Sequence, residues 1–349
     1  MTEMCKVVHG IEIPKSSKRY GHLFELAFTK QNIYDAYLDA RKNKRNKVGT
    51  FLFETSLGLN IELLYNELHS GTYASRGYRE FIVYEPKQRV IQAPHFRDLV
   101  VQHAIYRVIY NIFNKSFVNT SFACRKSGGT HKASIYTQTE MRKYDGNLYY
   151  AKLDVRKFFY SIHRDVLRKL FEKKIKDARL VDVMMLFADT KSSEIGIPIG
   201  NLLSQLYSLI YMNEMDNFVK RTLKVKSYVR YVDDFVLIGL TLEEAKNAKQ
   251  QCEEYLRSHL KMELSHWTIS KIRKGINFVG YRTWKFAKFV RKHSMYNFLR
   301  AVKKRKFESI VSLIGHASAT KTLVYYKQIL IDFGLLGLLP KGSRKCLSF

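Results

Sequence analysis

The sequence predicts a mixed α/β (α+β) fold, in which a β-rich central region lies between two helical flanks. Apolar residues recur at spacings of three and four through 20–70 and through Phe96–Phe117, which is the period of amphipathic helices. Leu148–Val155 alternates as a strand does, and Ser227–Val232 and Phe235–Ile238 read as a hairpin with two residues between its strands. The chain ends in a basic segment with a helical pattern. This order of elements indicates an α/β domain between helical segments.

The remaining elements follow from local signals. Arg79–Ile91 reads as a β-hairpin with a basic tip, because two apolar runs flank a Glu-Pro-Lys-Gln sequence. Gly196–Asn201 is predicted to be a rigid loop that opens a helix reaching roughly Leu223. Leu242–Leu260 is predicted to be an amphipathic helix, and Asn277–Arg282 a short strand.

The charge balance restricts the class of partner. Lys and Arg total 60 against 31 acids, a net charge of +29 that points to a polyanion. The basic residues recur along the whole chain, which favours a long electropositive channel over a membrane-surface helix. The four cysteines are scattered and form no C-x-x-C pair, so we expect neither a zinc site nor a disulfide framework but free thiols in a reducing cytoplasm. The N-terminus does not read as a signal peptide.

Three acids form the pattern that carries chemistry. Asp154 ends a predicted strand, and Asp233 and Asp234 form the predicted hairpin tip. Nucleotidyl transfer by two metal ions requires carboxylates that converge from separate elements. Because adjacent strand residues point to opposite faces, we expect Asp233 and Asp234 to be inequivalent. We predict that Asp154 and Asp233 bridge the ions and that Asp234 plays a supporting role.

Several blocks, in this order along about 50–285, resemble reverse transcriptases. The run around Tyr231-Val232-Asp233-Asp234 resembles their Tyr-x-Asp-Asp hairpin, and Leu153–Phe159 resembles the strand with their first catalytic Asp. Arg79–His103 resembles the fingers, and Asn277–Tyr281 the primer-grip hairpin. The resemblance implies a right-hand polymerase with helical/β fingers, a ferredoxin-like palm sheet and a small helical thumb. It also implies an RNA-directed DNA polymerase with two Mg²⁺ ions, held by Asp154, Asp233, Asp234 and the backbone carbonyl of Val155.

The loop after the first Asp narrows the resemblance. Most reverse transcriptases carry Gln-Gly-x-x-x-Ser-Pro here, whereas this chain has Ile199 and Gln205 at the two ends of the motif. That form is found in diversity-generating retroelements of phages and bacteria, which make error-prone cDNA from a template-repeat RNA for mutagenic retrohoming. Membership implies dNTPs, template RNA and its cDNA duplex as ligands, and a pentameric basic helical accessory protein in the bacterial cytoplasm. Ile199 offers no hydrogen bond where Gln would, so discrimination against mispairs depends on the shape of the nascent base pair alone.

Residues that match further motif positions of reverse transcriptases are expected to share the roles found there. Phe159 matches the steric gate that favours dNTPs over rNTPs. The residues expected to bind the dNTP are Lys87, Arg89, Lys157, Phe158, Phe159, Ile199, Gly200 and Gln205. Phe278, Gly280 and Tyr281 are expected in the primer grip. The residue that protonates pyrophosphate is left open between His266 and Lys271.

The same resemblance divides the chain. We expect a helical N-terminal extension at 1–50, fingers with part of the palm at 51–147, the palm at 148–284 and the thumb at 285–349. Two alternatives remain. A retron, group II intron-like or phage-defence reverse transcriptase is disfavoured by the Ile-Gly-x-x-x-Ser-Gln loop and by the absence of residues for maturase, endonuclease or RNase H domains. Outside the class, a non-catalytic basic RNA-binding protein would have little reason to keep all three acids.

Overall fold

The computed structural model describes residues 6–8, 11–13, 19–84, 88–190 and 193–347. The chain forms two compact units that are interleaved along the sequence. The helical unit comprises Met1–Val118, Val155–Asn217 and Glu254–Glu263, and the sheet unit comprises Asn119–Asp154, Phe218–Glu253 and Leu264–Phe349. Each unit is described below by itself. None of the described helices combines the length and the apolar character needed to cross a membrane.

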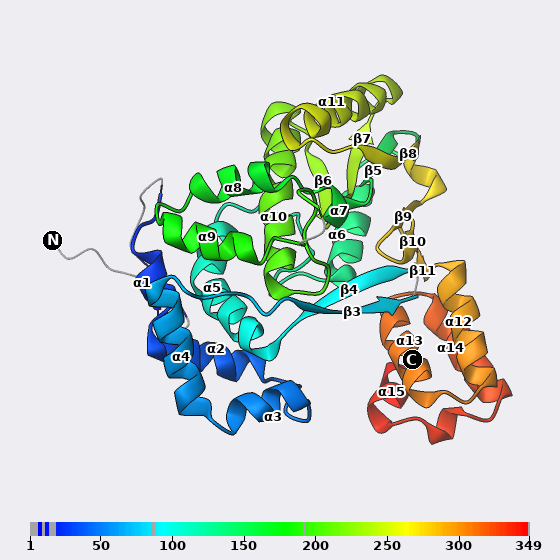
Figure 1. Cartoon of the computed structure of the whole chain (residues 1–349). Helices are drawn as coiled ribbons and strands as arrows, with labels where there is room; N and C mark the ends of the chain where they lie inside the picture. The colour runs from blue at the N-terminus through cyan, green and yellow to red at the C-terminus, as the bar shows by residue number, and fades with distance from the viewer. Residues whose placement is uncertain (1–5, 9–10, 14–18, 85–87, 191–192, 348–349) are drawn as a thin grey trace. The chain divides into compact units, whose positions relative to one another are not determined.

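A four-stranded sheet organises the sheet unit. Its strands are β5 (Tyr149–Val155), β6 (Ser227–Tyr231), β7 (Asp234–Leu240) and β8 (Leu264–Lys271). They lie in the order β6-β7-β5-β8, with the antiparallel β6–β7 hairpin beside β5 (Figure 1). Helices separate β5 from β6, and α11 (Leu242–Leu260) separates β7 from β8. This β-α-β-β-α-β order is that of the ferredoxin-like sheet predicted from the sequence.

The sheet is stabilised by an apolar core on one face and by hydrogen bonds along its β6 edge. Helix α6 (Thr130–Arg142) packs on β6 and β7, and buried side chains such as Val229, Val236 and Ile238 fill the space. At the β6 edge the chain segment before α6 adds two backbone bonds. The Arg230 N–H donates to the Thr120 carbonyl over 2.9 Å, and the Phe122 N–H donates to the Arg230 carbonyl over 3.0 Å. The edge strand is therefore paired on both sides where it leads into the hairpin.

A second, smaller assembly follows β8 along the chain. Its elements are β9 (Ile276–Phe278), β10 (Tyr281–Thr283), β11 (Lys288–Val290), α12 (Lys292–Lys303), α13 (Phe307–Ala317), α14 (Thr322–Asp332) and α15 (Lys341–Cys346). The helices share one apolar core with Tyr281 and Val290, as expected for a basic helical tail. The single strand predicted over Asn277–Arg282 is wrong. Val279 and Gly280 both have positive φ, 43° and 92°, so the chain reverses there in a two-residue hairpin.

The helical unit contains the predicted helices and the predicted hairpin. Its elements before residue 118 are β1 (Lys6–Val8), β2 (Ile11–Ile13), α1 (Leu23–Ala27), α2 (Lys30–Ala40), α3 (Val48–Glu54), α4 (Leu57–Ser70), β3 (Tyr78–Val83), β4 (Arg89–Pro94) and α5 (Phe96–Asn114). Later come α7 (Phe158–Ser161), α8 (Arg164–Glu172), α9 (Ala178–Leu186) and α10 (Leu202–Asn217). The N-terminal segment expected to be helical thus also carries a short hairpin, β1–β2.

A buried carboxylate anchors the β3–β4 hairpin. Asp98, in the first turn of α5, is fully buried and accepts hydrogen bonds from the Tyr73 hydroxyl (2.6 Å) and the Arg76 N–H (2.8 Å). Ser75 donates to the same carboxylate over 3.1 Å. These bonds join the segment before β3 to the first turn of α5, so the base of the β3–β4 hairpin is fixed to that helix.

Candidate active site

The three acids lie at the end of β5 and at the neighbouring hairpin of the sheet unit. Asp154 pairs in register with Asp234 of β7, so their side chains lie on the same face of the sheet. Tyr231 of β6 is the other register partner of Asp234, which leaves Val232 and Asp233 as a two-residue turn. The sequence predicted both acids of the pair at the tip, but Asp234 already belongs to the strand.

The hairpin turn is strained and is held in place by a buried arginine. Val232 has φ +58°, a conformation that costs a β-branched residue about 1–3 kcal/mol. A positive φ at the first of two turn residues alone is the pattern of a type II′ turn. The side chain of Arg230 is fully buried, and its Nη1 donates to the Val232 carbonyl over 2.8 Å. This bond fixes the position from which Asp233 projects.

Asp234 has an unusual environment for a carboxylate. Its Oδ2 lies 3.1 Å from Lys152 Nζ, whereas its Oδ1 is buried without a hydrogen-bond partner. Burial, together with the charges of Asp154 and Asp233, raises the pKa of Asp234 to about 7, and the ammonium of Lys152 opposes this shift. A half-buried carboxylate with one unsatisfied oxygen beside two other acids is a site of unfavourable negative charge.

Asp154 is held by a serine that sequence analysis missed. Ser265 of β8 donates to Asp154 Oδ1 over 2.5 Å and lies 3.2 Å from its backbone carbonyl. No signal pointed to Ser265, because the polar, mostly exposed pattern of β8 did not read as a strand. Lys152 lies two residues before Asp154 on β5 and therefore on the same face of the sheet, but its contact with Asp234 follows only from the pairing of β5 with β7.

The site fits divalent metal ions by the chemistry of its donors. Hard cations take oxygen ligands, and the unsatisfied Oδ1 of Asp234 beside two further carboxylates offers them. Across the described part of the chain, no group of three acidic, His or Cys side chains is already gathered around one point. Ser265 contacts Oδ1 of Asp154, and Lys152 contacts Oδ2 of Asp234.

The helical unit holds the predicted dNTP-binding loop against a strand of the β3–β4 hairpin. The Ile199 carbonyl accepts a hydrogen bond from the Gln92 N–H over 2.7 Å, and Arg89 begins the same strand, β4. Asn201 caps α10, because its Oδ1 accepts from the Ser204 N–H over 2.6 Å. Gln205 is exposed on the first turns of α10. Lys87 lies outside the described residues.

The predicted steric gate is anchored through its backbone to the loop before α10. The Phe159 carbonyl accepts from the Ile197 N–H over 2.9 Å. Its half-buried ring contacts the buried ring of Phe158 edge-on, with centroids 5.4 Å apart. Lys157 precedes them with φ +44°, so the chain turns sharply there. The structure brings Lys157, Phe158, Phe159 and the loop around Ile199 into one unit.

The predicted primer-grip residues form the β9–β10 hairpin, with their side chains turned inward. Phe278 lies in the sheet core and Tyr281 in the core of the C-terminal helices, each at most 1% exposed. Tyr281 donates to the His316 carbonyl over 2.9 Å. A primer contact from this hairpin would thus come from the tip at Val279 and Gly280, and its assignment stays a prediction.

The two alternatives for the pyrophosphate-protonating residue lie at opposite ends of β8. Lys271 Nζ lies 5.9 Å from the ring centre of Tyr149, at the start of β5. With a rise of about 3.3 Å per residue, Tyr149 is about 16 Å from Asp154 along that strand. His266 is exposed and adjoins Ser265, which contacts Asp154. Adjacent residues of a strand point to opposite faces, so His266 faces away from the side on which Ser265 contacts Asp154, and the choice between His266 and Lys271 stays open.

Replacing Gly200 with Ala is expected to disturb the predicted dNTP-binding loop. Gly200 has φ +115°, and a Cβ there would lie 2.7 Å from Ile91 Cγ2 and 3.3 Å from the Gln92 carbonyl oxygen. We expect a loss of about 1–3 kcal/mol and a lower Tm in thermal unfolding, with a higher KM for dNTP. The matched control is Gly58→Ala in α4, where nothing lies within 4 Å of the added Cβ. Equal melting of Gly200→Ala and the wild type would contradict the placement of this loop.

Comparison with known proteins shows the family. Residues 85–283 match the family model described as reverse transcriptase (RNA-dependent DNA polymerase). The chain belongs to this family and is by family an RNA-directed DNA polymerase, which confirms the fold class predicted from the sequence. Enzymes of this family act on an RNA template and use divalent metal ions.

The relatives include bacterial proteins. Protein YkfC of Escherichia coli K12 is 26% identical over 306 residues, covering 73% of this chain and 77% of YkfC. The group II intron-encoded protein LtrA of Lactococcus lactis subsp. cremoris is 23% identical over 326 residues, covering 71% of this chain. The chain spans only about half (54%) of the length of LtrA. Among solved structures, the telomerase of Candida albicans bound to a TWJ fragment of telomeric RNA matches with a TM-score of 0.47 and 12% identity, over 75% of this chain and 55% of that one.

Proposed function

We propose that this chain copies a template RNA into cDNA, with Asp154, Asp233 and Asp234 binding two Mg²⁺ ions. The observation that carries the proposal is the register pair Asp154–Asp234 beside the strained Val232–Asp233 turn. The support is that Asp154 of β5 and Asp234 of β7 are register partners, with Asp233 in the turn directly before β7. Negative charge at this site is not fully compensated, because Asp234 has an unsatisfied oxygen and a raised pKa.

Each acid has its own task in this proposal. Asp154 and Asp233 hold the ions, the Val155 carbonyl adds a ligand, and Asp234 supports the site from the position beside Lys152. When bound, the ions activate the primer 3′-hydroxyl and neutralise the triphosphate. The Arg89 guanidinium and the backbone amides near Lys157 bind phosphate oxygens, and Lys87 is assigned the same role. The gate residue Phe159 excludes the ribose 2′-hydroxyl.

We further propose that the cDNA is error-prone and serves mutagenic retrohoming in a diversity-generating retroelement, with a basic pentameric accessory protein as partner. Support comes from Ile199, whose half-buried side chain brings no hydrogen-bonding group to the loop that β4 holds. Rejection of a mispaired incoming nucleotide then depends only on the shape of the base pair. One missing hydrogen bond is worth about 1 kcal/mol, or several-fold in error rate.

Ile199→Gln tests this account of fidelity. We expect misincorporation opposite template adenine to fall several-fold, because an amide can bond the incoming nucleotide only when the pair has good geometry. The measurement is sequencing of cDNA made from one defined RNA. Ile199→Leu is the matched control and should keep the wild-type error spectrum. Unchanged fidelity in Ile199→Gln would remove Ile199 from the explanation.

A group II intron-like role is the second candidate, because LtrA is among the relatives. The same cDNA sequencing separates the two roles. Substitutions concentrated at template adenines support the diversity-generating role, whereas an accurate copy supports the alternative. The proposed division into fingers (51–147), palm (148–284) and thumb (285–349) applies to both roles.

A further inference from the structure

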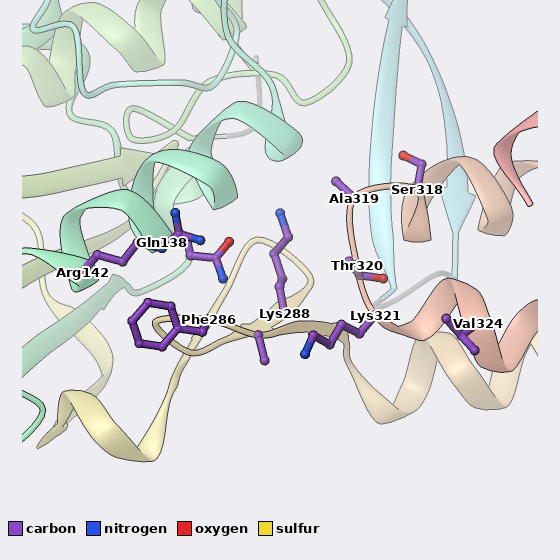
Figure 2. Close-up of a pocket in the computed structure, with 10 residues that line it drawn as sticks. Gln138, Arg142, Phe286, Lys288, Ser318, Ala319, Thr320, Lys321 and Val324 are labelled. Carbon is purple, nitrogen blue, oxygen red and sulfur yellow. The ribbon is translucent and has the colours of Figure 1, made fainter. Parts of the chain in front are cut away.

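A basic surface pocket lies in the sheet unit, away from the three acids in the sequence. It has a volume of about 370 Å³ and is formed by α6, the turn between β10 and β11, and the connection from α13 to α14 (Figure 2). Arg142, Lys288 and Lys321 each contribute a cation, and no acidic side chain of the described residues lines it. The pocket therefore selects for an anion.

Lys288 is the unusual member of this pocket. The residue is only 4% exposed, yet among the described residues its ammonium has neither an ion pair nor a hydrogen bond. Its Nζ lies over the ring of Tyr281, 5.3 Å from the ring centre. Figure 2 shows the side chain rising from β11 into the space between Gln138 and Thr320. Desolvation by burial lowers the pKa of Lys288, so its charged form is less favourable here than in water.

The other polar groups leave donors open around this cation. Within the described part of the chain, Arg142 is bonded through its Nε, which donates to the Lys285 carbonyl over 2.8 Å, so its two Nη groups are left for a ligand. Lys321 stands at the N-terminus of α14, whose first-turn amides have no side-chain cap. Ser318 adds a hydroxyl at the lining. Several N–H and O–H donors around a buried ammonium match the oxygens of a phosphate.

An exposed aromatic ring sits at the same pocket. Phe286 is 78% exposed, and the Arg142 guanidinium carbon lies 5.9 Å from its ring centre. Such a ring loses nothing by stacking on a base, and bases are free to stack only where the nucleic acid is single-stranded. Phosphate donors beside an open ring thus match one unpaired nucleotide.

We propose that this pocket binds one nucleotide of a single-stranded RNA, with a backbone phosphate on Lys288 and Arg142 and a base on Phe286. The proposal rests on membership in an RNA-copying family and is independent of the three acids. The bound strand lies outside the base-paired primer and template. The pocket thus keeps unpaired RNA on the enzyme during synthesis.

Binding measurements without dNTPs test this proposal separately from catalysis. The probes are a labelled single-stranded RNA oligonucleotide and a blunt RNA–DNA duplex, titrated with the full chain at several salt concentrations. For Lys288→Met we expect roughly fivefold weaker binding of the single strand and a salt slope lower by about 0.7. For Phe286→Ala we expect about fivefold weaker binding with an unchanged slope, because stacking releases no counterions. Duplex affinity should be unchanged in both variants.

Stability measurements separate a binding role from a structural one. Without RNA, Lys288→Met should melt at or above the wild-type temperature, because it removes an unpaired buried charge. Lys246→Met, which removes an exposed lysine paired with Glu243, is the control and should change neither affinity. The proposal is overturned by wild-type RNA affinity in Lys288→Met, by an equal loss for duplex, or by a lower melting temperature that accounts for the loss. It is also overturned if inorganic phosphate stabilises the wild type through Lys288 while the single strand does not, since the pocket would then hold free phosphate.

Discussion

Asp233→Asn is expected to reduce RNA-templated DNA synthesis by roughly 10³-fold, a loss of about 4 kcal/mol of transition-state stabilisation. Asp233 projects from a turn that Arg230 fixes, and an amide there keeps the shape but removes a charged ligand. Asp234→Asn should cost far less, about tenfold, because Lys152 already neutralises much of the charge of Asp234. The measurement is single-nucleotide primer extension under saturating dNTP.

The control for this pair is Asp165→Asn. Asp165 is an acid on α8 that pairs with Lys261 over 2.8 Å and is half exposed, so its loss should leave synthesis unchanged. RNA affinity should be retained in all three variants, since none of them removes a positive charge. A larger loss in Asp234→Asn than in Asp233→Asn would reverse the proposed ranking of the two acids.

Phe159→Ala is expected to lower the preference for dNTP over rNTP by roughly 10²-fold in kcat/KM, about 3 kcal/mol of discrimination. The backbone of Phe159 is tied to Ile197, so truncation should remove the ring without moving the chain. The lower preference should result from faster rNTP incorporation, with dNTP incorporation reduced only slightly.

The neighbouring Tyr160→Ala is the matched control. Tyr160 is 51% exposed and shares the short helix α7, so its truncation should leave sugar selectivity unchanged. Competition between labelled rCTP and dCTP on one template measures both variants. An unchanged preference in Phe159→Ala would show that another group meets the 2′-position.

Much of the fold could be read from the sequence because its periodic elements are long or sharply bounded. Helix α11 begins and ends at the predicted residues, and β5 differs from its prediction by one residue. Strand β8 was missed because its exposed side chains, such as His266 and Trp267, hide the alternation. The pattern of apolar residues predicted one strand over Asn277–Arg282, because nothing in it indicates that Val279 adopts a positive φ; only the resemblance implied the β9–β10 hairpin.

The candidate site could be predicted to a similar extent. The sequence pattern and the resemblance together pointed to the three acids, and the register of β5 with β7 pairs Asp154 with Asp234; their roles stay a prediction. The sequence could not predict the partners Ser265 and Lys152, because those contacts depend on strand order and on diagonal neighbours across the sheet. The sequence could not predict that Lys288 is buried beside the pocket, because that depends on the packing of three distant segments around it.

Primer extension on a heteropolymeric RNA by the wild type and by Asp154→Asn tests the central claim most directly. The account predicts cDNA of the template's length from the wild type with Mg²⁺, and none from Asp154→Asn at equal RNA affinity. Synthesis by Asp154→Asn at the wild-type rate would contradict the assignment of the site, and a wild type that binds RNA without extending the primer would contradict the proposed function.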